Sequence, residues 1–161
     1  MSSAIEPLSA NMEDYLEVIN ALAMDKGVAR IGEIAEKMDV KSSSVNAAMK
    51  LLSDRKLVVH ERYGYVSLTE EGKKIAMEVQ SKHNVLFRFL TEFLMVDPKK
   101  AENEACCIEH SISEDTAQRL IKFFKFLEMS PCDQKPFVLK IFETYLKTGK
   151  RMFCECEKAG K

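Results

Sequence analysis

The spacing of apolar residues in the first half of the chain predicts three helices followed by a hairpin. Apolar residues recur at the three- and four-residue steps of one helix face: Met12, Tyr15, Leu16, Ile19, Leu22 and Ala23. This pattern predicts a helix over 11–25. Shorter helices are expected over 31–38 and 43–54. The turn between them contains several serines, which are typical N-cap residues, and this indicates two helices joined by a turn. Two β-type runs, 57–62 and 65–68, flank a turn with glycine at its tip and predict a β-hairpin.

The second half of the chain is predicted to be helical. Thr69 is followed by two glutamates, which indicates the start of a long helix over 69–94. The pair Asp97-Pro98 is typical of a helix start, and further helices are expected over 113–128 and 136–146. The helix over 113–128 has more apolar side chains than one small core needs, which predicts a dimer interface. These side chains are Leu120, Ile121, Phe123, Phe124, Phe126 and Leu127.

These elements together predict a mainly α fold with two successive domains. Three helices and a hairpin form a winged helix-turn-helix, which we expect to be a DNA-binding domain over residues 1–73. A helical domain for dimerisation and metal binding is expected over 74–130. Residues 131–161 are predicted to form a C-terminal helix and a tail with cysteines, and no motif assigns a role to this segment.

Composition and charge narrow the class of protein. Charged residues make up 30% of the 161-residue chain, and the formal net charge is −1, so contact with nucleic acid must depend on a local basic patch. No apolar run is long enough for a membrane span, and the N-terminus lacks the apolar segment of a signal peptide. Five cysteines, an odd number, do not suggest a secreted disulfide framework. We therefore expect a cytoplasmic protein with reduced thiols and no membrane contact.

The predicted helix-turn-helix and hairpin offer side chains suited to DNA. Its second helix begins with small polar residues that can approach base edges, and lysines and arginines nearby can contact phosphates. The predicted DNA-binding residues are Lys41, Ser42, Ser43, Ser44, Asn46, Lys50, Arg62 and Tyr63.

The stretch from Ala105 to His110 has the strongest chemical signal. On a helix, Cys106, Glu109 and His110 share one face within a single turn, because they stand at i, i+3 and i+4. Roughly the opposite face is apolar and is expected to pack: Ala101, Ala105, Ile108 and Ile112. Thiolate, carboxylate and imidazole are ligands of divalent transition metals. A small thiol beside a solvated Glu-His pair is the alternative that this motif alone leaves open.

Further candidate ligands lie on other predicted helices. Asp14 and Glu17 stand at i, i+3 away from the apolar stripe of the first helix, and they are either solvated acids or paired carboxylate ligands. His83 falls among apolar positions of the long helix, where a lone histidine is usually a satisfied core residue.

In this order and spacing, four motifs resemble the diphtheria-toxin-repressor family of metal-dependent transcription regulators. The motifs are Met12–Glu17, Leu68–Gly72, Lys82-His83 and Ala105–His110. The resemblance covers residues from about Met12 to Leu127 and is greatest to the short, manganese-transport-regulator branch, because the chain ends before an SH3-like third domain could fit.

The resemblance implies a homodimer that binds double-stranded operator DNA when Fe²⁺ or Mn²⁺ is bound and represses metal-uptake genes. It implies one or two cations per subunit, no small-molecule substrate and no enzymatic activity. The implied ligands are Asp14, Glu17, His83, Cys106, Glu109 and His110. The chain combines the cysteine of iron-type members at Cys106 with the aspartate of manganese-type members at Asp14. Phe87 stands where iron-type members have a glutamate for an ancillary site, so we do not expect that site.

Two alternatives stay open at this level. A metal-independent winged-helix regulator would have the same features in the first half of the chain. A cysteine hydrolase using Cys106 and His110 is disfavoured, because no glycine-rich oxyanion turn accompanies the thiol. Cys132, Cys154 and Cys156 lack the C-x-x-C spacing of zinc or iron–sulfur sites, and we predict no second metal site there.

Overall fold

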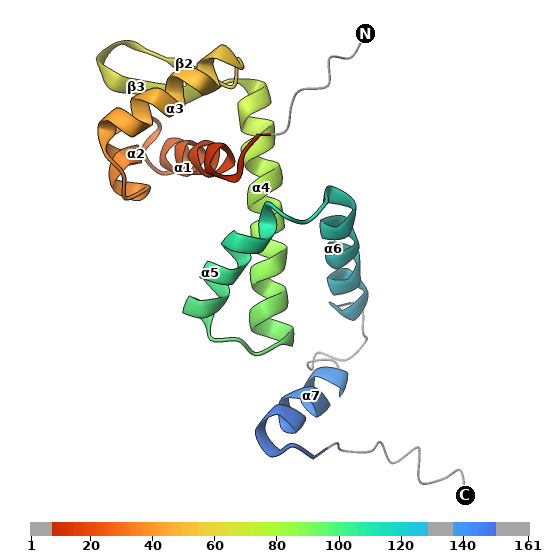
Figure 1. The fold of residues 1–161 in the computed structure, drawn as a ribbon. Helices are drawn as coiled ribbons and strands as arrows, with labels where there is room; N and C mark the ends of the chain where they lie inside the picture. The colour runs from red at the N-terminus through yellow and green to blue at the C-terminus, as the bar shows by residue number, and fades with distance from the viewer. Residues whose placement is uncertain (1–7, 129–136, 151–161) are drawn as a thin grey trace, which may run out of the picture. The chain divides into compact units, whose positions relative to one another are not determined.

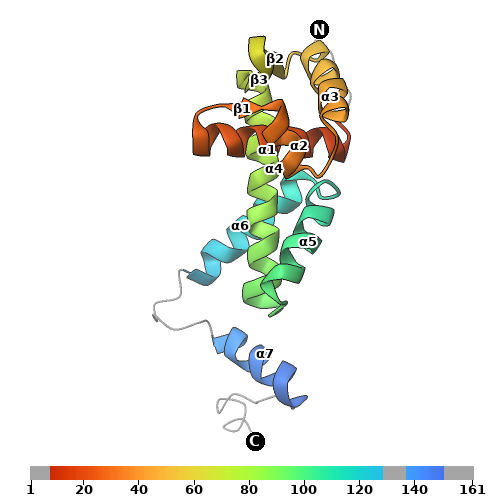
Figure 2. The same ribbon diagram turned by 90° about the vertical axis from the view of Figure 1, so that its left-hand side faces the viewer.

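A computed structural model describes residues 8–128 and 137–150 of the chain. The chain divides into two compact units, Met1–His83 and Asn84–Lys161, and each unit is described by itself. Figures 1 and 2 show the ribbon from two directions, with the helices of each unit labelled in chain order. None of the helices in the described ranges has the length and apolar character that a membrane crossing requires.

The first unit is built on three helices, α1 (Ala10–Lys26), α2 (Ile31–Lys37) and α3 (Ser42–Asp54). Helix α1 ends at Gly27, whose φ of +80° is a left-handed conformation that glycine adopts without strain. The predicted apolar stripe of α1 is its buried face and is confirmed, and α3 also buries one apolar face. The core of this unit contains Tyr15, Leu16, Ile19, Leu22, Ile34, Val45, Met49, Leu52, Leu57 and Val66 among its buried residues.

A small antiparallel sheet completes the winged helix. Its strands are β1 (Ala29–Arg30), β2 (Val58–His60) and β3 (Tyr65–Leu68), in the spatial order β1-β3-β2. The hairpin of β2 and β3 is the predicted one, and it turns through the short 3₁₀ segment η1 (Arg62–Gly64). Strand β1 was not predicted. It pairs Ala29 with Val66, which lies far away in the sequence.

Helix α4 (Glu70–Arg88) crosses the boundary between the two units. The long helix predicted over 69–94 does not stay α-helical to its end, because η2 (Phe89–Phe93) is a π-helical turn. In η2 the amide of Leu94 donates to the carbonyl of Phe89, five residues earlier.

The second unit places α5 (Pro98–Glu109) and α6 (Glu114–Glu128) on opposite sides of the rod formed by the end of α4 and η2 (Figures 1 and 2). Asp97 caps α5 by accepting from the amides of Lys99 and Lys100, as the Asp-Pro pair predicted. Two separate cores result. One contains Leu86, Leu90, Ala101 and Ala105; the other contains Val85, Phe93, Ala117, Phe124 and Leu139 of α7 (Phe137–Thr148). Cys132, Cys154 and Cys156 lie outside the described residues.

The mainly α architecture with an N-terminal winged helix is therefore confirmed. Both predicted hairpin strands form, and the predicted helices that fall in the described residues form close to their expected bounds, except that the long helix over 69–94 stays α-helical only to Arg88. The division between the two compact units falls at His83, inside α4, and the domain boundary expected at residue 73 stays a prediction.

Candidate metal centre and DNA-binding surface

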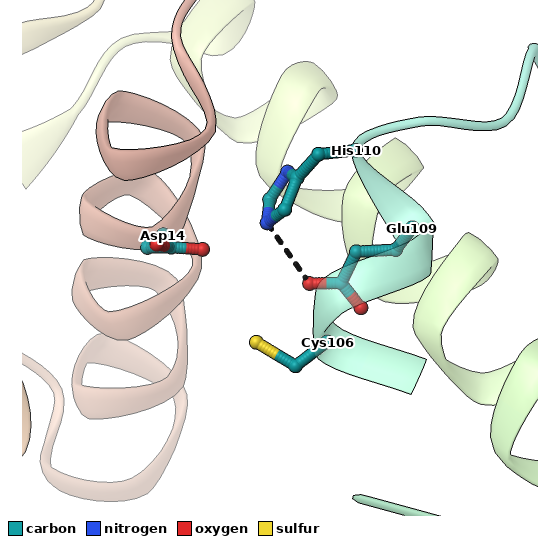
Figure 3. Close-up of side chains that lie close together, drawn as sticks. All are labelled: Asp14, Cys106, Glu109 and His110. Carbon is teal, nitrogen blue, oxygen red and sulfur yellow. Dashed lines mark ion pairs between the residues drawn. The ribbon is translucent and has the colours of Figure 1, made fainter. Parts of the chain in front are cut away.

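Three predicted ligands come together at the end of α5. Cys106, Glu109 and His110 each offer one ligand atom, and these three atoms lie within 4.8 Å of one another. The Nε2 atom of His110, at the C-cap of α5, lies 3.3 Å from the Oε1 atom of Glu109. Figure 3 shows the three side chains on the same side of α5. The i, i+3, i+4 spacing thus produces the cluster that the sequence predicted.

The burial of Glu109 distinguishes this cluster from a surface Glu-His pair. Its exposed fraction is 0%, and it is the one charged residue among the buried side chains of the described ranges. His110 is largely buried, whereas Cys106 is exposed. A carboxylate removed from water is costly unless a cation or several donors compensate its charge. The cluster therefore has a fully desolvated acid beside an imidazole and a thiol.

The orientation of α5 differs from the prediction in one respect. The buried row of the helix runs Ala101, Ala105, Glu109, in steps of four residues, so the carboxylate continues the packed face instead of lying opposite it. Ile108, which was predicted to pack, is 37% exposed. The reason is that the row at four-residue spacing is the one that packs on the neighbouring helix, with Leu86 and Leu90 in the same core.

The donor set fits a divalent transition metal. Ligand atoms about 2.0–2.3 Å from one ion are at most roughly 4.6 Å apart, which is close to the observed spread of these three atoms. Sulfur, oxygen and nitrogen together suit borderline cations such as Fe²⁺, Co²⁺ or Zn²⁺, and the oxygen ligands also suit Mn²⁺. Three ligands from one helix end leave coordination positions to be supplied by other groups.

The other predicted ligands belong to the first unit. Asp14 and Glu17 lie one turn apart on α1, and both are half-buried. Figure 3 also draws Asp14 on its helix. His83 is half-buried on α4, while Val79, one turn earlier, is buried. Both interpretations of His83, a ligand or a satisfied core residue, stay predictions.

The predicted DNA-binding residues of α3 lie on its exposed face. Lys41, at the N-cap, is exposed, and so are Ser42, Ser43, Ser44, Asn46 and Lys50. The opposite face holds the buried residues Val45, Ala48, Met49 and Leu52. The side-chain amide of Asn46 donates to the backbone carbonyl of Ser42 at 2.9 Å. A helix with a buried apolar side and an exposed face of hydroxyl, amide and ammonium groups is suited to a major groove.

The wing adds further groups. Tyr63 is 93% exposed at the tip of the hairpin, with a φ of +64°, and Arg62 belongs to the same turn. Arg30 was missed by the sequence analysis, because β1 is too short to leave a pattern. Its guanidinium donates to the hydroxyl of Tyr65 at 2.8 Å and lies 5.0 Å from the centre of that ring. Arg30 therefore adds an exposed positive charge beside the wing.

Both halves of the chain match one described family. Residues 7–66 match "Iron dependent repressor, N-terminal DNA binding domain", and residues 69–137 match "Iron dependent repressor, metal binding and dimerisation domain". The first match covers the winged helix, and the second covers α4, α5 and α6, including the three clustered side chains.

Individual relatives agree with this match. The chain is 34% identical over 133 residues to the HTH-type transcriptional regulator MntR of Bacillus pumilus, covering 83% of this chain and 90% of the relative. A structure of IdeR from T. acidophilum is 28% identical with a TM-score of 0.64, covering 78% of this chain and 56% of that one. A manganese-dependent transcriptional repressor in complex with manganese is 27% identical with a TM-score of 0.64, covering 71% and 53%. The chain thus spans little more than half the length of these two structures.

Proposed function

This chain belongs to the iron-dependent repressor family of metal-dependent transcriptional repressors, and from that premise we propose that it binds operator DNA as a homodimer when Fe²⁺ or Mn²⁺ occupies the cluster on α5. It would act in the cytoplasm on genes for metal uptake. The two family matches support a role of the winged helix in binding DNA and of the helical half in binding metal and dimerising.

The observation that carries the proposal is the burial of Glu109 beside Cys106 and His110. A fully buried carboxylate has a large free-energy cost unless a positive charge compensates it. His110 supplies such a charge only in its protonated form, and a protonated imidazole cannot bind metal. A bound divalent cation would supply two positive charges to these ligands and allow the imidazole to stay neutral.

We propose that the remaining ligands come from the first unit. Asp14 and Glu17 offer hard carboxylate oxygens from α1, and His83 offers an imidazole from α4. Ligands drawn from the DNA-binding half as well as from α5 would make the mobility of the DNA-binding half depend on metal. Affinity for DNA then changes because the metal-bound protein favours one arrangement of its two units.

The DNA contacts proposed for each subunit follow from the exposed face of α3. Lys41 and Lys50 are suited to phosphates, and the serines at 42–44 with Asn46 are suited to base edges. Arg62 and Tyr63 of the wing would contact the neighbouring backbone. In a homodimer, two copies of α3 would have to match half-sites about one helical turn apart, ~34 Å.

The decisive experiment measures operator binding by fluorescence anisotropy across a series of divalent cations under anaerobic conditions. We expect Fe²⁺ and Mn²⁺ to tighten binding by about 5- to 150-fold, the usual range of such coupling. With Cys106 as a ligand, the site should have a higher affinity for Fe²⁺ than for Mn²⁺, in line with the general stability order. Equal DNA affinity with and without every cation would overturn the proposal and support the metal-independent winged-helix regulator.

A further inference from the structure

The start of α4 is tied to the end of α3 by a compact set of hydrogen bonds, which we call the Thr69 joint; it comprises Lys56, Leu57, Thr69 and Gly72. The hydroxyl of Thr69 lies 2.8 Å from the carbonyl oxygen of Lys56 and 3.2 Å from that of Leu57. The amide of Thr69 also donates to the carbonyl of Leu57 at 3.0 Å. The same hydroxyl accepts from the amide of Gly72 at 3.1 Å, which caps the helix.

Backbone packing makes this joint tight. A Cβ atom on Gly72 would overlap the carbonyl oxygen of Leu57, so the first turn of α4 lies directly against the chain that leaves α3. Lys56 has a φ of +59°, a left-handed conformation that is uncommon for a residue with a side chain. Such conformations persist where the surroundings hold them in place, and here the Thr69 hydroxyl contacts the carbonyl of that residue.

The joint lies between the two elements that the proposed function needs to connect. Helix α3 carries the DNA-facing residues and ends at Asp54, two residues before Lys56. Helix α4 continues past His83 into the second unit, so it is the covalent connection between the units. An α-helix resists bending, and the way its first turn is held therefore fixes its direction relative to α3.

We propose that Thr69 is a positioning residue that sets how strongly DNA affinity responds to metal, an inference that rests on the proposed function. The hydroxyl has two separable roles. As an acceptor for Gly72 it caps α4, a role that serine or aspartate also fills. As a donor to Lys56 and Leu57 it holds α4 against the end of α3, a role that a carboxylate cannot fill because it has no proton to donate.

Three variants separate the two roles. Thr69→Ser keeps both the cap and the donor, Thr69→Asp keeps the cap and loses the donor, and Thr69→Val loses both. The readout is the ratio of operator affinities with and without saturating Mn²⁺, measured beside thermal unfolding and the affinity for Mn²⁺ alone. We expect Thr69→Ser to keep the wild-type ratio and Thr69→Asp to lower it about fivefold, the effect of one lost hydrogen bond.

The outcomes are distinguishable. A wild-type ratio in Thr69→Asp would overturn the proposal, and this includes equal weakening of DNA binding with and without Mn²⁺, which is the effect of a merely structural role. If circular dichroism shows Thr69→Asp to be unfolded, Thr69→Ala removes the donor without adding charge and is judged by the same ratio. Absence of a response to Mn²⁺ in the wild-type protein would instead be a failure of the proposed function.

Discussion

The Nε2 atom of His110 lies 3.3 Å from the Oε1 atom of Glu109, and this carboxylate has no exposure to solvent. A buried acid held against an imidazole is a poor arrangement for stability alone, because replacing such a pair with apolar residues is often neutral or stabilising. Its position at the end of α5, beside the exposed Cys106, is the reason that we propose a bound cation here.

Removing the imidazole should abolish the response to metal. In His110→Ala we expect a folded dimer whose operator affinity no longer rises when Fe²⁺ or Mn²⁺ is added, because a ligand is lost while Ala101 and Ala105 still pack. The rise in operator affinity that metal causes in the wild-type protein should be at least about fivefold, and His110→Ala should lose it. Asn103→Ala, an exposed change on the same helix, is the matched control. A wild-type metal response in His110→Ala would place the site elsewhere.

Changing the thiol should change the preference between metals. Cys106→Glu replaces a soft ligand with a hard one, so the concentration of Mn²⁺ for half-maximal operator binding should fall relative to that of Fe²⁺. We expect the ratio to shift about tenfold, which corresponds to ~1.4 kcal/mol. Anaerobic titration of both metals measures it, and Cys107→Ser tests a neighbouring exposed thiol. An unchanged ratio in Cys106→Glu would show that Cys106 is not a ligand.

Lys50 should contact phosphate and not bases. Lys50→Ala is expected to weaken binding to all DNA sequences and to reduce the slope of log affinity against log salt by about 0.9, the value for one phosphate contact. Titration of operator and random DNA between 50 and 200 mM salt, roughly the range in which such contacts are felt, checks this. An unaltered salt slope would remove Lys50 from the interface. Lys74→Ala, an exposed lysine of α4, is the control.

Asn46 should contribute to the choice of sequence. Asn46→Ala is expected to lose about 1–3 kcal/mol of discrimination between the operator and random DNA, because asparagine is suited to adenine edges. The bond from its amide to Ser42 leaves the side-chain oxygen available to accept from a base amine. Competition binding with operator variants measures the loss. Equal weakening on operator and random DNA would contradict a role in base recognition.

The exposed aromatic side chains of α6 should lie in the dimer interface. Phe126 is 71% exposed and Phe123 is 45% exposed, although both are large apolar residues. In Phe126→Glu the dimer dissociation constant should rise at least about tenfold, because a charge would be buried against the partner. Analytical ultracentrifugation measures the constant, and Lys125→Glu places the same carboxylate at a neighbouring exposed position. An unchanged dimer in Phe126→Glu would exclude this face.

Much of the first unit could be predicted from sequence because its helices each have one apolar stripe. The stripe of α1 has the residues that the core buries, and in the second unit Asp97 caps α5 through a local signal. Strand β1 could not be predicted in this way. Its two residues are held by pairing with Tyr65 and Val66, a contact distant in sequence that no local pattern records.

The candidate site was predicted in part for a similar reason. Helical spacing alone groups Cys106, Glu109 and His110, because residues three and four apart share a face in any helix. The burial of Glu109 and the exposure of Ile108 depend on how α5 is turned about its own axis, and packing against Leu86 and Leu90 decides that. The assignment of Asp14, Glu17 and His83 as ligands stays a prediction.

The π-helical turn η2 makes the packing that follows it depend on the number of residues in this part of the chain. A π turn advances by a smaller angle per residue than an α-helix does, so Phe93 is rotated away from the row of Leu86 and Leu90. Phe93 packs instead on Phe124 of α6, with ring centres 4.8 Å apart. The continuous helix formed by α4 and η2 thereby changes its helical phase between the two cores. Loss of a single residue within η2 would restore the phase and turn Phe93 away from Phe124, so the number of residues here matters more than their identity.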